Sequence, residues 1–252
     1  MRAFVVIASL AVHLAGMAGA QQPVTRADGL GIVEAYFAED ADVYPHRVLG
    51  DIREKLALSA RDHEGRFHNV RLYLRGNRRT VFEDIAPRLA DVTGDGLNDI
   101  VVVESDPQKG ASLAVYGLQQ GRLTKVGATP HIGSRFRWLA PAAIADLNGD
   151  GITDIAYVET PHLGKTLRVW SWIDGGLTEI ANLKGVTNHR IGDEVIWGGL
   201  RDCGEGPEIV LADAGFQGLV AVAFAGDTLS ERPLGIEASA DGFDGAMSCL
   251  LP

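Results

Sequence analysis

The chain lacks the short motifs that mark many catalytic sites in a sequence. It has no Ser-centred nucleophile elbow, no His-Glu-x-x-His zinc motif, no phosphate loop and no Cys-x-x-Cys pair. Basic residues are also fewer than acidic ones. The chain has 23 Lys and Arg and 33 Asp and Glu, which gives a net charge of −10. An acidic chain without a basic patch argues against binding to nucleic acid.

Long apolar runs are equally scarce. The run at residues 3–14 follows Arg2 and precedes the small residues 18–20, which is the order of a signal peptide and its cleavage site. This run is too short to predict a membrane span, although a retained anchor is the alternative. We expect residues 1–20 to be a signal peptide and residues 21–252 to form one domain. That domain is expected to be exported, to a bacterial periplasm or outside the cell, without a membrane span.

What the sequence does contain is a repeated acidic phrase. Asp91-Val-Thr-Gly-Asp-Gly-Leu-Asn-Asp99 returns as Asp146-Leu-Asn-Gly-Asp-Gly-Ile-Thr-Asp154, and each copy runs directly into an apolar segment. Self-similarity of this kind indicates a repeat architecture. Glycines within each copy allow tight winding, because glycine reaches positive φ without steric cost.

Oxygen-bearing residues stand at alternate positions of each copy. Positions 1, 3, 5 and 9 supply side-chain oxygens, and position 7 can supply its backbone carbonyl. Calcium takes about six to eight oxygens at about 2.3–2.6 Å, so the pattern predicts two calcium sites. The predicted ligands are Asp91, Thr93, Asp95, Leu97 and Asp99 in the first loop, and Asp146, Asn148, Asp150, Ile152 and Asp154 in the second. The alternative is a solvated Asp-Gly turn between strands.

These loops are not EF-hands. An EF-hand needs a glutamate at position 12 and a following helix. Position 12 is Val102 in the first copy and Tyr157 in the second, and both lie in segments rich in β-branched and aromatic residues. Such segments are typical of strands, so each loop is expected to join two strands of a sheet.

The two phrases with their flanks, Leu-Ala-Asp-Val-Thr-Gly-Asp-Gly-Leu-Asn-Asp-Ile and Ile-Ala-Asp-Leu-Asn-Gly-Asp-Gly-Ile-Thr-Asp-Ile, resemble the FG-GAP/VCBS repeat family. This family provides the calcium-loop repeats of integrin α-chain-like β-propellers. The resemblance covers only the two loops and their flanks, but its motif is specific. It implies a propeller in which blades carry such a loop between their first two strands.

Weaker copies and a regular strand pattern extend the repeat. Residues 197–211, around Asp202, and residues 47–59, around Asp51, keep an aspartate and a following strand but lack the alternating oxygens, so neither is expected to bind calcium well. With one strand before each loop, four strands per blade are expected, which is the propeller plan. The strands predicted after the loops are residues 100–104, 112–116, 123–126, 155–159, 166–172, 177–182, 208–212, 219–224 and 228–232.

The two ends of the chain suggest how the ring closes. Residues 243–251 resemble the first strand of an unfinished blade, and residues 31–38 and 43–44 are spare N-terminal strands. We therefore expect an all-β, five-bladed β-propeller in which N-terminal strands complete the C-terminal blade. Six or seven blades are alternatives, and a calcium-rich β-sandwich is the rival fold. Beyond the signal peptide no helix is expected.

The only two cysteines occupy equivalent places in neighbouring repeats. Aligning Cys203 with Cys249 predicts a disulfide in an oxidising compartment, with two free buried thiols as the alternative.

Two further sets of residues have competing interpretations. The histidines 46, 131 and 189 precede the first strands of blades and could converge as a metal or acid–base site, although repeat-equivalent packing is favoured. The tryptophans 138, 170, 172 and 197 could stack on sugars, although packing between blades is favoured.

The sequence therefore predicts a monomeric, non-enzymatic calcium-binding module that presents loops to a partner it does not identify. A lectin-like glycan binder, and a hydrolase or lyase with an axial site, are the alternatives, since fold alone does not decide between them.

Overall fold

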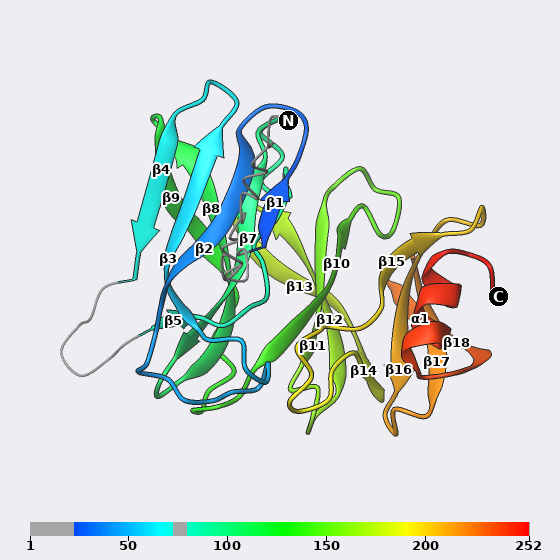
Figure 1. Cartoon of the computed structure of the whole chain (residues 1–252). Helices are drawn as coiled ribbons and strands as arrows, with labels where there is room; N and C mark the ends of the chain where they lie inside the picture. Colours follow the sequence, from blue (N-terminus) through cyan, green and yellow to red (C-terminus); the bar gives the residue numbers. More distant parts are fainter. Residues whose placement is uncertain (1–22, 73–79, 252) are drawn as a thin grey trace, which may run out of the picture.

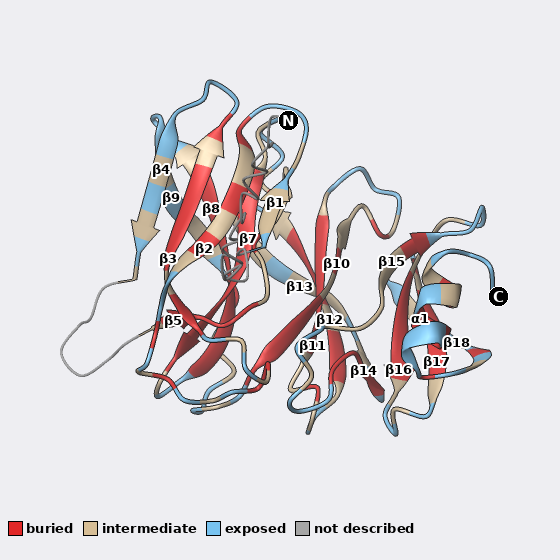
Figure 2. Ribbon diagram, in the orientation of Figure 1, coloured by how far each residue is buried: buried red, intermediate tan, exposed pale blue. Residues whose placement is uncertain are grey.

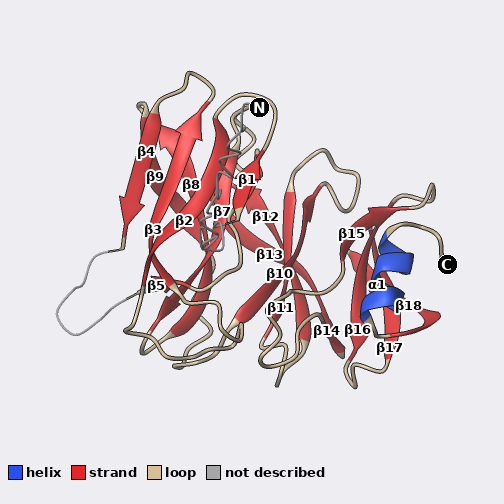
Figure 3. Cartoon of the chain, viewed as in Figure 1, coloured by secondary structure: helices blue, strands red, loops and turns tan. Residues whose placement is uncertain are grey.

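The computed structural model describes residues 23–72 and 80–251 (Figure 1). Strands dominate these residues, and one short helix, α1 (Ala240–Met247), follows the last described strand (Figure 3). The chain is all-β, as predicted. The predicted signal peptide lies outside the described residues. Within the described ranges, no helix is long and apolar enough to cross a membrane.

The described strands form three sheets with antiparallel ladders. One sheet has the order β1-β2-β3-β5-β7-β8-β9, with β4 beside β3 and β6 beside β7; the second is β10-β11-β12-β13; the third is β14-β16-β17-β18, with β15 beside β16. The strands are β1 (Val24–Arg26), β2 (Ile32–Asp40), β3 (Lys55–Asp62), β4 (Phe67–Arg71), β5 (Val81–Phe82), β6 (Arg88–Ala90), β7 (Asp99–Asp106), β8 (Gly110–Gln119), β9 (Arg122–Ala128), β10 (Leu139–Ala145), β11 (Asp154–Glu159), β12 (Thr166–Ile173), β13 (Gly176–Lys184), β14 (Val186–Thr187), β15 (Gly199–Asp202), β16 (Pro207–Asp213), β17 (Gly218–Ala225) and β18 (Thr228–Glu237).

Four units of one plan make up these sheets. Each is a four-stranded meander: β1–β4, β6–β9, β10–β13 and β15–β18. The short strand β5 pairs with both β3 and β7 and joins the first two units into one sheet. The predicted strands after the three loops correspond to β7–β9, β11–β13 and β16–β18, and the strand predicted at residues 31–38 corresponds to β2. The four-strand plan predicted for each repeat is therefore present.

The second strand of a unit lies between two cores, and β7 shows why its sequence is continuously apolar. Ile100 and Val102 enter the core shared with the first unit, whereas Val101 and Val103 enter the core shared with the third unit. Successive side chains of a strand point to opposite faces, so a strand covered on both faces needs apolar residues at every position. β11 and β16 divide their side chains in the same way, although the outer face of β16 packs against α1, and Figure 2 shows these strands buried.

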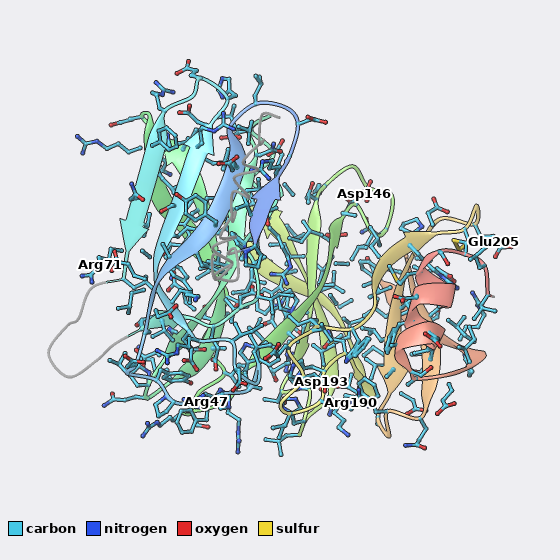
Figure 4. All side chains as sticks on the ribbon, in the orientation of Figure 1. Arg47, Arg71, Asp146, Arg190, Asp193 and Glu205 are labelled. Carbon is cyan, nitrogen blue, oxygen red and sulfur yellow. A yellow bond between two sulfur atoms is a disulfide. The ribbon has the colours of Figure 1, made fainter. Side chains whose placement is uncertain are left out.

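Antiparallel connections place the loops alternately on two opposite rims. The aspartate rim carries residues 91–98, 146–153 and 203–206, which join the first and second strands of three units. The opposite rim carries residues 41–54, 107–109, 129–138, 160–165 and 188–198. In Figure 4, Asp146 and Glu205 mark the aspartate rim, and Arg47, Arg190 and Asp193 mark the opposite rim. The predicted calcium loops therefore share one side of the molecule.

The strand predicted at residues 243–251 is wrong, because most of this segment belongs to helix α1 or follows it. Ser239 caps the helix, its side chain accepting a hydrogen bond from the backbone N–H of Gly242 at 3.2 Å. Phe243 and Ala246, nearly one helical turn apart, are buried against the last sheet. A serine N-cap followed by apolar residues at helical spacing was the signal that the strand interpretation missed.

The predicted ring closure is wrong as well. β2 pairs with β1 and β3, within the first unit, and does not complete the last sheet. Residues 43–44 are not a strand, since Tyr44 is buried in a loop and its hydroxyl accepts a hydrogen bond from Phe136. Instead of sharing a sheet, the first and last units meet through loops: the N–H of Gly192 donates to the carbonyl of Val48 at 3.1 Å. The described strands form four units, without the predicted fifth.

The predicted disulfide between Cys203 and Cys249 is confirmed, with the two Cα atoms 5.7 Å apart. Cys203 follows β15 on the aspartate rim, and Cys249 lies in the turn after α1. The bond therefore attaches the C-terminal helix to the last sheet, and it does not join two equivalent strands as the alignment suggested.

Candidate metal loops and the opposite rim

In the first loop the backbone is organised by the carboxylate of Asp91. Its Oδ1 accepts hydrogen bonds from the N–H groups of Gly94 at 2.8 Å and Asp95 at 3.1 Å, and its Oδ2 accepts from Gly96 at 2.9 Å. The loop is thereby wrapped around its first aspartate. Each carboxylate oxygen has more than one lone pair, so these bonds leave acceptor capacity for a cation.

The second loop repeats this geometry position by position. Asp146 Oδ1 accepts from Gly149 at 2.7 Å and Asp150 at 3.1 Å, and its Oδ2 accepts from Gly151 at 2.9 Å. Asp150 in turn accepts from the N–H of Ile152 at 2.8 Å, as Asp95 does from Leu97. The sequence repeat is therefore also a structural repeat.

The glycines of both loops are required by backbone conformation. Gly94 and Gly96 have φ of +73° and +83°, and Gly149 and Gly151 have φ of +80° and +85°. An added Cβ would meet nothing within 4 Å at any of the four. Their role is thus the left-handed backbone that winds the loop, which L side chains adopt only with strain.

The last aspartate of each loop is buried at the start of the second strand. Asp99 accepts hydrogen bonds from Val92 and Thr93, and Asp154 accepts from Leu147. Burial raises the pKa of Asp99 to about 6, although the hydrogen bonds from Val92 and Thr93 lower it. The nearby negative charge of Asp95 raises the pKa further. Burial and neighbouring loop aspartates also raise the pKa of Asp154. A bound cation would stabilise both charged forms.

The side chains at position 3 differ between the loops. The Thr93 hydroxyl oxygen is buried and has no hydrogen-bond partner among the described residues. Asn148 is used within its own loop, where its side-chain oxygen accepts from the N–H of Asp150 at 3.1 Å. Carboxylate, hydroxyl and amide oxygens form the hard donor set that calcium prefers, so the residues fit the ion.

Over the described ranges, no three His, Cys, Asp or Glu side chains form a preassembled metal cluster. The fit consequently rests on mixed oxygen donors held by loop geometry, and calcium stays a prediction for the ten predicted ligands.

The weaker copy at Asp202 keeps the turn without the ligands. Asp202 Oδ1 accepts from Gly204 at 2.8 Å and Gly206 at 3.2 Å, while Cys203 occupies the position after it. The turn is therefore held by hydrogen bonds and a disulfide.

The weaker copy at Asp51 was assigned wrongly. Asp51 lies on the opposite rim, where its N–H donates to the Glu194 side chain at 3.3 Å. The first unit makes its equivalent turn at residues 27–31, between β1 and β2, where the sequence reads Ala-Asp-Gly-Leu-Gly before an apolar strand. This shortened Asp-Gly phrase was the signal that sequence reasoning missed.

A histidine pair lies on the opposite rim. His162 Nε2 and His189 Nδ1 are 2.9 Å apart, and the Trp138 ring packs edge-on against His189 with centroids 4.9 Å apart. Burial and His189 lower the pKa of His162 to about 4. His46 also lies on this rim, where its Nδ1 is 2.6 Å from a carboxylate oxygen of Glu83. The Nδ1 of His131 instead contacts the carbonyl oxygen of Gly110.

The space at these histidines is small. The cavity lined by His46, Phe136, Trp138, His162 and neighbouring loop residues has a volume of about 20 Å³. That volume suits roughly one water molecule. The packing interpretation of the histidines is therefore the better one, and His162, which the sequence pattern did not single out, belongs with them.

A larger cleft of about 590 Å³ lies elsewhere, along β2, β3 and residues 51–53. Four of the charged residues that line it are engaged in ion pairs, among them Arg53, which pairs with Asp42 at 3.2 Å. Lys55 pairs with Asp40, and Asp84 pairs with Arg88.

Three of the four tryptophans pack between units, as the favoured interpretation predicted, and Trp197 does not. Trp138 and Trp170 are 2% and 8% exposed, and both lie in the core between the second and third units. Trp172 packs against the same core, and Trp197 packs against the core beneath α1.

Comparison with known proteins identifies the repeat. The family model for FG-GAP-like repeats matches residues 91–157, a segment that contains both aspartate loops. This chain carries an FG-GAP-like repeat. The resemblance read from the sequence is thus confirmed, and the FG-GAP-like segment spans the second unit and the beginning of the third.

No curated protein matches the chain. Among solved structures, the crystal structure of rhamnogalacturonan lyase YesW is similar at 16% identity with a TM-score of 0.42. The match covers 84% of this chain but 44% of that structure, so the chain spans less than half of the lyase. A likeness of this degree says nothing about activity.

Proposed function

We propose that this protein is an exported, calcium-stabilised, β-propeller-like module that binds another protein and does no chemistry. The observation that carries the proposal is the pair of FG-GAP-like loops with matching hydrogen bonds around Asp91 and Asp146. Two loops of one geometry on one rim favour a repeated structural site over a single reactive centre.

Calcium acts in this proposal by neutralising the loop carboxylates. Asp91, Asp95 and Asp99 would hold the ion in the first loop together with Thr93 and the Leu97 carbonyl. The corresponding residues of the second loop are Asp146, Asn148, Asp150, Ile152 and Asp154. Because Asp99 and Asp154 begin buried strands, stabilising their charged forms stabilises the junction between each loop and its sheet.

The geometry favours binding over the alternative functions. A sugar-stacking platform needs exposed aromatic rings, whereas Trp138 and Trp170 are buried in a core. An active site needs convergent titratable groups around a substrate-sized pocket. The cavity beside the His162 pair has a volume of about 20 Å³, and in the larger cleft of about 590 Å³ Lys55 and Asp84 are engaged in ion pairs. Export agrees with the disulfide, since disulfides persist in oxidising compartments.

Calorimetry on the full chain freed of metal tests the calcium sites. We expect about two ions per chain, with dissociation constants on the order of 10⁻⁴–10⁻³ M, as in extracellular modules. The double variant Asp95→Ala plus Asp150→Ala should lose both, and the control Asp202→Ala should keep both. A stoichiometry near zero, or one unchanged in the double variant, would refute the calcium sites.

The binding role is tested by capturing partners from an exported-protein fraction with and without chelator. We expect the chelator and the double variant Asp95→Ala plus Asp150→Ala to reduce capture together. Capture that is indifferent to both would separate binding from calcium and contradict the proposal.

A further inference from the structure

Exposed cations gather on the opposite rim of this acidic protein. Arg47, Lys109, Arg135 and Arg137 are exposed, and they come from three loops. Among the described residues, no carboxylate forms an ion pair with any of the four, although most other arginines of the described ranges have one. We call these four residues the basic rim. In a chain of net charge −10, unpaired cations on one side are a local reversal of sign.

Contacts between loops bring the basic rim together. The Phe136 ring, between Arg135 and Arg137 in sequence, stacks on His46 with centroids 4.8 Å apart, so it lies beside the residue that precedes Arg47. The carbonyl of Lys109 accepts a hydrogen bond from Gly133 at 2.7 Å. The three loops therefore form one continuous surface.

The backbone holds one residue of the basic rim, and a neighbour of two others, in an unusual conformation. Arg47 and Phe136 have φ of +51° and +60°, in the left-handed region that residues other than glycine rarely adopt. The guanidinium of Arg135 lies over the Phe136 ring at 4.3 Å. Strained conformations persist only where surrounding contacts hold them.

Exposed apolar side chains adjoin the cations on the same rim. Leu163 is 61% exposed, Ile191 is 73% exposed and Val195 is 43% exposed. The contact between His162 and His189 joins the loops that carry them. Two acidic residues lie in the loop that carries Ile191 and Val195. Asp193 is engaged by Arg190 and by the indole N–H of Trp197, and the exposed Glu194 accepts a hydrogen bond from the N–H of Asp51 at 3.3 Å.

We propose that the basic rim and its apolar neighbours bind an acidic protein segment in which carboxylates alternate with apolar side chains. The proposal rests on the proposed function and names the chemistry of its partner. Charge complementarity selects a polyanion, since arginine binds carboxylates in bidentate fashion. Exposed aliphatic side chains, with Trp138 buried, favour a peptide over a polysaccharide.

The probe is a fluorescent synthetic peptide of alternating glutamate and leucine, measured by anisotropy with the full chain. The triple variant Arg47→Gln, Arg135→Gln and Arg137→Gln should bind about tenfold more weakly, because it removes three exposed partners of the peptide carboxylates. Its affinity should also depend less on salt.

A matched control triple removes equal charge elsewhere: Arg26→Gln, Arg122→Gln and Arg232→Gln. Equal weakening in both triples would mean that net charge alone acts, and it would overturn the proposal. A second variant, Leu163→Ser plus Ile191→Ser, should also weaken binding, and unchanged binding would overturn the apolar half of the surface. Stronger binding of a sulfated polysaccharide than of the peptide would assign the rim to glycans instead.

Calcium titration of the rim triple distinguishes this inference from the proposed function. We expect the triple to bind calcium as the unmodified chain does. If the peptide does not bind while calcium-dependent capture persists, the basic rim is not the docking surface and the proposed function stands.

Discussion

Replacing Gly31 with alanine should damage the junction between the first unit and the first aspartate loop. Gly31 lies immediately before β2 with φ of +80°, and it forms a parallel bridge with Asn98. An alanine Cβ there would lie 2.4 Å from the Asn98 nitrogen and 2.8 Å from its carbonyl oxygen. No flexible side chain can move aside, because the obstacle is backbone.

The cost has two parts. A non-glycine residue in the left-handed region costs about 1–2 kcal/mol, partly offset by the lower entropy of the unfolded chain. The clash also pushes the two segments apart and so weakens two hydrogen bonds between them. These run from the N–H of Ile32 to the Asn98 carbonyl at 3.0 Å and from the N–H of Asn98 to the Leu30 carbonyl at 2.8 Å. Each contributes about 0.5–1.5 kcal/mol, so Gly31→Ala should destabilise by about 2–4 kcal/mol.

Gly65→Ala is the matched control. Gly65 lies in the turn between β3 and β4 of the same unit at φ of +83°, and its added Cβ would meet nothing within 4 Å. Its cost should therefore be only the conformational part, about 1 kcal/mol. Urea unfolding followed by circular dichroism measures both variants. Equal losses at the two positions would show that the contact with Asn98 contributes nothing, and would refute the reasoning.

Three further outcomes follow from other parts of the structure. Replacing Cys203 and Cys249 together by serine should cost about 2–4 kcal/mol, because the bond restricts the unfolded chain; a melting temperature that matches the oxidised wild type would contradict this. The folded-state pKa of His162 is lowered to about 4 by burial and by His189, so the unfolded chain binds more protons between about pH 6.5 and pH 4. The free energy of unfolding should therefore fall as the pH falls through this window. The urea midpoint of a His162→Gln variant should decrease less steeply with falling pH than that of the wild type. Equal dependence of the two midpoints on pH would exclude His162 as the cause. Ser239→Ala should destabilise α1 by about 1 kcal/mol through loss of its N-cap, with unchanged thermal unfolding as the contrary result.

Much of the repeat could be read from the sequence because its signals are local. The loop at Asp91 needs positive-φ glycines and side-chain oxygens within nine consecutive positions, so its geometry is written in neighbouring residues. β7 and β11 are continuous apolar runs because both faces of each strand are covered. The pairing of Cys203 with Cys249 could be predicted because the chain has only two cysteines, whereas the repeat register that also suggested it was wrong, since Cys249 follows a helix.

Other features depended on contacts between distant residues. An Asp-Gly turn marks the first unit at Asp28, yet Asp51 carries a similar local phrase, and only the pairing of β1 with β2 distinguishes them. Residues 243–251 suit a strand or a helix by composition, and the Ser239 cap with the burial of Phe243 decided for the helix.

The sequence by itself determined the composition of the last three units: a strand, an aspartate turn and three further strands. Only the tertiary structure decided which rim each loop occupies. The cations Arg47, Lys109 and Arg137 lie 28 or more positions apart in the chain, and they share a surface because antiparallel strands return successive loops to the same side. Such a surface has no local motif, since packing between units creates it.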